Sequence, residues 1–180
     1  MSVINIKAIG AKNLKSVTTF ERQDPYLTLE ISPTDLSILD FVKNVQKTQV
    51  HEDGGRSATW NENFVFEVQD HTKVTLTLAV FNDNYRKDDM IGRVRVDLAP
   101  IFAKHAMDEI FEETIQLVDQ SNVSKTAGNI MLTLQWHNEA MRIKEDASVN
   151  SALTELEKVK RELEEAKAAA TKAAEVKCEA

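Results

Sequence analysis

The sequence predicts an all-β fold, an eight-stranded antiparallel sandwich, followed by a long C-terminal α-helix. Three observations lead to this expectation. Apolar and polar residues alternate in several short segments up to Trp136, which is the period of a half-buried strand. Turn-rich loops such as Asp53-Gly54-Gly55 separate these segments, with no long helical pattern between them. Every glycine, proline and aromatic residue lies at or before Trp136, and the remaining chain is rich in Ala, Glu and Lys, as in a long helix.

The eight strands follow one another along the first three quarters of the chain. Six segments alternate clearly, and two more, near residues 43–50 and 110–117, alternate less regularly. The six clear segments are Ile4–Ala8, Leu27–Ile31, Phe64–Val68, Val74–Val80, Val94–Leu98 and Ile130–Trp136. A short helix is expected near Pro100–His105, because proline suits a first helical turn. These elements divide the chain into a β domain over residues 1–137 and a helical tail over residues 138–180.

Charge and cysteine content limit the partners and the compartment. The net charge of -7 makes nucleic acid an unexpected partner, because phosphate binding needs clustered Lys and Arg. The single cysteine, Cys178, cannot form an internal disulfide, which is typical of a reducing compartment. No stretch approaches the roughly 20 apolar residues that span a bilayer. We therefore expect a cytoplasmic protein.

Several spaced motifs resemble the C2 domain family from Val3 to Trp136. They are Ala11–Leu14, Asp24–Leu29 with its Asp-Pro-Tyr signature, the Trp-Asn-Glu strand Trp60–Phe66, Asp88–Gly92 and Gly128–Leu134. The order of these motifs is similar to the circularly permuted form called type II topology. The resemblance implies a C2-type β-sandwich with its binding loops at one end.

The resemblance also raises the question of calcium. Family members that bind calcium use about five carboxylates from two loops, because a hard dication needs many oxygen ligands. The matching positions here are Thr18, Asp24, Asn82, Asn84 and Asp89, of which two are acids. The candidate ligands are therefore Asp24, Asn82, Asp83, Asn84, Asp88 and Asp89. We expect these side chains to cap turns and interact with water, and no cofactor is expected; weak calcium binding through asparagine oxygens stays the alternative.

Membrane lipid is a second candidate partner. Phe20 and Tyr85 lie near the predicted tips of two loops, and Arg86 and Lys87 follow Tyr85. Basic residues near an anionic surface contribute only about 1 kcal/mol each. Lys47, together with Lys43, is the only basic residue on the strand where the family tends to have a lysine-rich patch. Lipid binding is therefore the less favoured reading, and packing of Phe20 under its own loop is the favoured explanation of that residue.

The tail carries a heptad pattern when Leu156 is taken as position a. The apolar seam consists of Val149, Ala152, Leu156, Val159, Leu163, Ala166, Ala170 and Ala173. This repeat predicts a coiled coil or a helix that docks on a partner, while its many alanines leave a lone solvated helix as the alternative.

No catalytic motif is present, and the four histidines are scattered along the sequence. We expect a non-catalytic interaction or scaffold module, independent of calcium, whose tail mediates self-association or binds a protein. By analogy with the family, a cytoskeletal or ciliary scaffold is implied. The alternative is a peripheral phospholipid-binding protein with residual calcium dependence.

Overall fold

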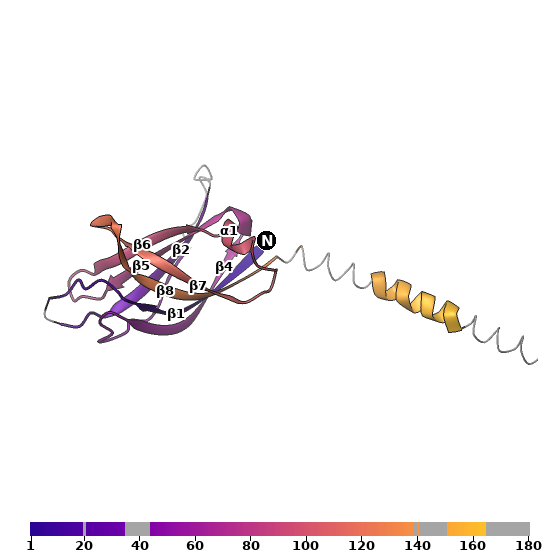
Figure 1. Ribbon diagram of the computed structural model, residues 1–180, viewed down its shortest axis with the longest axis horizontal. Helices are drawn as coiled ribbons and strands as arrows, with labels where there is room; N and C mark the ends of the chain where they lie inside the picture. Colours follow the sequence, from indigo (N-terminus) through magenta and orange to yellow (C-terminus); the bar gives the residue numbers. More distant parts are fainter. Residues whose placement is uncertain (20, 35–43, 139, 141–150, 165–180) are drawn as a thin grey trace, which may run out of the picture. The chain divides into compact units, whose positions relative to one another are not determined.

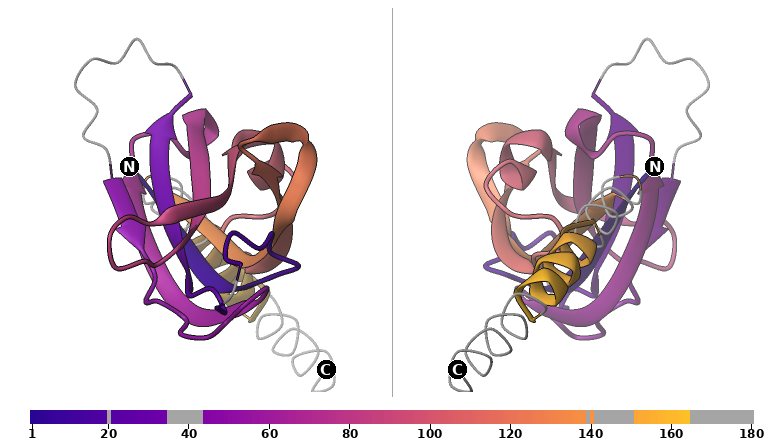
Figure 2. Two further views of the ribbon diagram at one scale, coloured as in Figure 1. Left: turned by 90° about the vertical axis from the view of Figure 1, so that its left-hand side faces the viewer. Right: turned by 90° about the vertical axis from the view of Figure 1, so that its right-hand side faces the viewer.

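The computed structural model describes residues 1–19, 21–34, 44–138, 140 and 151–164. Its elements are β1 (Ser2–Lys12), β2 (Pro25–Pro33), β3 (Asn44–Lys47), β4 (Ala58–Val68), the 3-10 helix η1 (His71–Lys73), β5 (Val74–Asn82), β6 (Asp89–Asp97), α1 (Ala99–Phe102), β7 (Phe111–Asp119) and β8 (Asn122–Asn138). The residues separate into two compact units, Met1–Asn138 and Glu139–Ala180. All eight strands belong to the first unit, which Figures 1 and 2 show from three sides.

The eight antiparallel strands form two layers of four. The order is β3-β2-β5-β6-β7-β8-β1-β4, and β6 and β7 pair only at Arg93 and Val118. That single bridge lets β3-β2-β5-β6 fold over β7-β8-β1-β4 as a sandwich. Gly92 lies beside this junction, where a Cβ atom would come within 2.5 Å of the Ala127 Cβ. A side chain at Gly92 would therefore push the layers apart.

The core lies between the two layers and follows the alternation of the sequence. The largest fully buried side chains are Phe66, Ile4, Ile6, Leu14, Leu27, Leu29, Ile31, Leu76, Leu78, Ile91, Leu98 and Leu117. Because successive side chains of a strand point to opposite faces, each strand contributes every second residue to this core. The predicted all-β sandwich of eight strands is confirmed.

Several boundaries differ from the predicted ones. The segment expected at Ile130–Trp136 is the second half of a strand that begins at Asn122, because its first residues continue the hairpin with β7. Asn138, assigned to the tail by sequence, is the last residue of β8 and donates a hydrogen bond from its Nδ2 to the Ser2 Oγ at 3.1 Å. The short helix expected near Pro100–His105 is α1, a single turn over Ala99–Phe102.

The second unit contains a helix over the described residues 151–164. The long helix predicted over residues 138–180 is therefore seen only in this part, since most of the remaining tail lies outside the described residues. Among the described residues, no helix has both the length and the apolar character needed to cross a membrane.

Candidate functional site

The loops that precede β2, β4 and β6 meet at one end of the sandwich. Asp24 and Asn82 lie on neighbouring strands, since Pro25 pairs with Asn82 across β2 and β5. The loop before β4 joins this pair where the Asp53 N–H donates to the Asp24 Oδ1 at 2.6 Å. The positions that the family resemblance relates to calcium are therefore brought close together, although they are widely spaced in the sequence.

Asn82 lies at the centre of this loop end and is almost completely buried, with 2% of its surface exposed. Its Oδ1 accepts a hydrogen bond from the Asp24 N–H at 2.6 Å, and its Nδ2 donates to the Asn84 Oδ1 at 2.8 Å. The backbone N–H can only donate, so it fixes which end of the amide is the oxygen. The amino group of Asn82 must therefore point into the loop between β5 and β6.

Asn84 continues the chain of hydrogen bonds. Its Nδ2 donates to the Asp89 Oδ2 at 3.0 Å and to the Lys87 carbonyl oxygen at 3.2 Å. Its backbone N–H donates to the Asp88 Oδ1 at 3.0 Å. We call this connected set the amide relay; it consists of Asp24, Asn82, Asn84, Asp88 and Asp89. Amide donors thus satisfy acids that would otherwise repel one another.

The far end of the amide relay is anchored by Tyr26. The Tyr26 hydroxyl donates to the Asp88 Oδ2 at 2.7 Å. Burial, together with this bond to the carboxylate, raises the pKa of Tyr26 to about 12. The hydroxyl of Tyr26 and the backbone N–H of Asn84 lower the pKa of Asp88. The Tyr26 ring stacks on Phe81 at 5.6 Å between centroids, and the Lys47 Nζ lies 5.6 Å from the Tyr26 centroid.

The amide relay does not have the form of a calcium site. Calcium requires several inward-facing oxygens that together neutralise its charge. Here the Asn82 amino group points inward, the Asp24 Oδ1 accepts from Asp53, and Asp88 is turned toward Tyr26. Asp83 is exposed, and its N–H donates to the Asp24 carbonyl oxygen at 3.0 Å. Within the described ranges, no three His, Cys, Asp or Glu side chains are grouped as a metal site.

The tip of the loop between β5 and β6 is basic and aromatic. Tyr85 is fully exposed, and Arg86 and Lys87 are also exposed. Phe20, the other predicted tip residue, lies outside the described residues. Val123, exposed at the start of β8, was not among the predicted tip residues, because the strand was expected to begin later. The Lys15 Nζ reaches Asp119 at 2.8 Å, so the turn before Val123 lies at the same end of the sandwich as the first loop.

A row of basic side chains crosses the outer face of the β3-β2-β5-β6 layer. Lys47 pairs with Thr28, Thr28 with Ala79, and Ala79 with Arg93, so these residues lie side by side on one face. Arg95 lies two residues farther along β6 on the same face. The sequence had pointed only to the strand with Lys47; the alternation of arginine and valine from Arg93 to Val96 was the signal that could have revealed the row.

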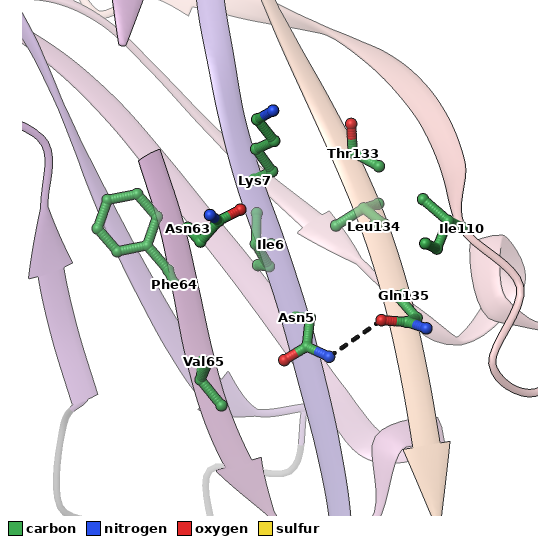
Figure 3. A pocket seen from close by; sticks show the side chains of 10 residues that line it. All are labelled: Asn5, Ile6, Lys7, Asn63, Phe64, Val65, Ile110, Thr133, Leu134 and Gln135. Carbon is green, nitrogen blue, oxygen red and sulfur yellow. Dashed lines mark hydrogen bonds between the residues drawn. The ribbon is translucent and has the colours of Figure 1, made fainter. Parts of the chain in front are cut away.

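The other layer carries a shallow pocket of about 360 Å³ on its outer face (Figure 3). Asn5, Asn63 and Gln135 line it, together with the exposed apolar side chains of Val65 and Ile110. The Asn5 Nδ2 donates to the Gln135 Oε1 at 3.1 Å, as Figure 3 shows. This pocket lies on strands β4, β1 and β8, and its polar groups are not connected to the amide relay.

The tail helix presents the described part of the predicted seam. Ala152, Leu156, Val159 and Leu163 are exposed, as is Leu153. Val149, Ala166, Ala170 and Ala173 lie outside the described residues. The described seam is thus a half-exposed apolar face on an otherwise charged helix.

Comparison with known proteins identifies the fold and the family. Protein SRC2 of Glycine max is 28% identical over 131 residues, which cover 70% of this chain and 43% of that protein. The Multiple C2 domain and transmembrane region protein 8 of Arabidopsis thaliana is 26% identical over 158 residues, or 88% of this chain and 15% of that protein. The chain therefore spans less than half the length of these two relatives.

A solved structure supports the same fold. A C2 domain of plant Extended Synaptotagmin 1, the first of that protein, superposes with a TM-score of 0.61 at 20% identity, over 76% of this chain and 94% of that domain. The family model of the C2 domain matches residues 2–113, which hold the first six strands in full and the whole amide relay. The chain belongs to the C2 domain family.

Proposed function

We propose that this chain is a non-catalytic C2 interaction module that works without calcium. The amide relay is the observation that supports the proposal. In a calcium-binding arrangement the cation would neutralise the loop acids, whereas here amide N–H groups and the Tyr26 hydroxyl bind Asp88 and Asp89. The loops then need no metal to hold their conformation.

The proposed role is that of a scaffold in the cytoplasm, associated with the cytoskeleton. The C2 unit would bind a protein, and the helix over residues 151–164 would bring copies together or dock on a partner. The exposed apolar face of that helix supports this part of the proposal, because a single helix cannot bury such a face by itself. The longer coiled coil over the seam from Val149 to Ala173 is part of the same proposal.

Binding of anionic phospholipid is the second candidate function. It is favoured by the exposed Tyr85 at the tip, with Arg86 and Lys87 beside it. Arg93 and Lys47 add positive charge on the neighbouring sheet face. An aromatic ring with basic neighbours suits the interface of a negatively charged bilayer.

Two measurements test these proposals. Thermal unfolding of the full chain in chelator and in millimolar calcium should give the same midpoint within about 2 °C, because ligand stabilisation requires affinity for the folded state. A rise of more than about 5 °C, which exceeds 1 kcal/mol for a domain of this size, would refute calcium independence.

Co-sedimentation with phosphatidylserine vesicles decides between the two functions. If lipid is the ligand, the double variant Arg86→Glu/Lys87→Glu should lose binding. The matched control is Lys73→Glu/Lys104→Glu, which changes charge equally at the opposite end of the sandwich. Failure of the wild-type chain to pellet would exclude the lipid candidate, and binding that requires calcium would exclude the leading one.

A further inference from the structure

The helix over residues 151–164 carries an apolar face that the structure leaves in water. Leu153, Leu156, Val159 and Leu163 retain between 52% and 62% of their surface exposed. The last three follow the heptad spacing, so they lie along one side of the helix. Burial of such leucines and valines is favourable by about 25 cal/mol per Å² of apolar surface, so a partner surface is needed.

The charges beside this face choose between possible partners. With Leu156 at position a, Glu155 and Glu162 occupy position g, while Lys160 and Lys167 occupy position e. In a parallel pair of helices, position g faces position e of the next heptad in the partner. Glu155 then faces Lys160 of a second copy, and Glu162 faces Lys167.

An antiparallel pair would reverse this complementarity. Position g would then face position g, and position e would face position e, so Glu would meet Glu and Lys would meet Lys. Such juxtapositions are unfavourable, since like charges repel across the seam. The same five-residue spacing therefore favours one orientation and disfavours the other.

We propose that the tail helix binds a second copy of this chain in a parallel, in-register pair. This inference rests on the proposed self-association of the tail and gives it a partner, an orientation and a register. Two C2 units then precede a single helical pair, and two weak loop contacts with one target act together through a raised effective concentration.

Disulfide trapping in the full chain tests the orientation. In a Cys178→Ser background, Ala152→Cys and Ala166→Cys each place a thiol at position d, near opposite ends of the central heptads. A parallel pair should give cross-linked dimers within each variant when it is oxidised alone. In a mixture it should give at least tenfold less of the mixed dimer, made of one chain of each variant, than of dimers within a variant. Predominance of the mixed dimer would show an antiparallel pair and overturn the proposal.

Charge reversal tests the partner. Glu155→Lys/Glu162→Lys places only lysines at these four positions, and Lys160→Glu/Lys167→Glu places only glutamates. Each variant alone should associate at least tenfold more weakly than the wild-type chain in sedimentation equilibrium, and a mixture of the two should recover association. A matched control, Glu157→Lys/Glu164→Lys, changes position b and should leave association unchanged.

A wild-type chain that stays monomeric at about 100 μM, near the concentrations of a typical sedimentation run, would overturn the proposal, because even a weak pair with Kd near that value would be visible. This failure is separable from failure of calcium independence, which is measured by the calcium-dependent melting of the C2 unit. Binding of a different protein by a monomeric tail would likewise exclude a second copy as the occupant.

Discussion

Replacement of Asn82 by aspartate tests the amide relay directly. Asn82→Asp preserves size and shape but turns the Nδ2 donor into a second oxygen. That oxygen would lie about as far from the Asn84 Oδ1 as the present 2.8 Å bond, with no proton between two acceptors. The backbone bond from Asp24 is kept, because a carboxylate also accepts. The change therefore isolates one hydrogen bond and one added charge.

The magnitude follows from the burial of the side chain. Asn82 is 2% exposed, so the new charge and the Asn84 oxygen would both lose a partner away from water. Leaving buried polar groups unpaired costs about 1–3 kcal/mol, and a stronger charge-assisted bond from Asp24 offsets part of this. We expect a net loss of about 1–2 kcal/mol, which lowers the unfolding midpoint by roughly 3–12 °C.

Thermal unfolding in chelator, followed by circular dichroism, measures this loss. The matched control is Asn122→Asp, because the exposed Asn122 uses only its Oδ1, which accepts from the Ser124 N–H at 3.1 Å. The control should unfold within about 0.5 kcal/mol of the wild type, as surface substitutions usually do. Burial beside Asp24 should raise the folded-state pKa of the new carboxyl, so the defect should shrink as the pH falls below neutral. Equal stability of Asn82→Asp and Asn122→Asp at pH 7 would refute the relay.

Three further predictions concern the same sandwich. Tyr26→Phe removes the hydroxyl that binds Asp88 and should destabilise the chain by about 0.5–1.5 kcal/mol in urea unfolding; no change would show that the bond is not formed in solution. The bond with Lys15 and those with Ser121 hold the pKa of Asp119 well below its usual range. A carboxyl with a lowered folded-state pKa contributes stability above its unfolded pKa, near 4, and this stability is lost as the pH falls. Asp119→Asn should therefore flatten the decline of the unfolding midpoint between about pH 4 and 2, and a decline as steep as that of the wild type would contradict this cause. Gly92→Ala should cost about 1–3 kcal/mol in the same urea assay, because its Cβ would lie 2.5 Å from that of Ala127; an unaffected variant would mean that the two layers separate easily.

The amino-acid sequence alone was sufficient for the strands and the family. Alternation is local, since each strand buries every second residue whichever neighbour it pairs with, and segments such as Leu27–Ile31 and Phe64–Val68 carry that pattern in themselves. The motifs around Asp24 and Trp60 lie in the same order as in other C2 domains. The loop residues of the candidate site could also be named, because they follow strands that were already recognised.

The tertiary structure decided what those loop residues do. The orientation of the Asn82 amide is set by a backbone N–H that lies 58 residues away in the sequence, and Asp88 is turned by a hydroxyl 62 residues away. The row from Lys47 to Arg93 likewise exists only through the register of β3, β2, β5 and β6. Hydrogen bonds are directional and act over about 3 Å, so residue types and spacings cannot specify which donor meets which acceptor until the strands have paired.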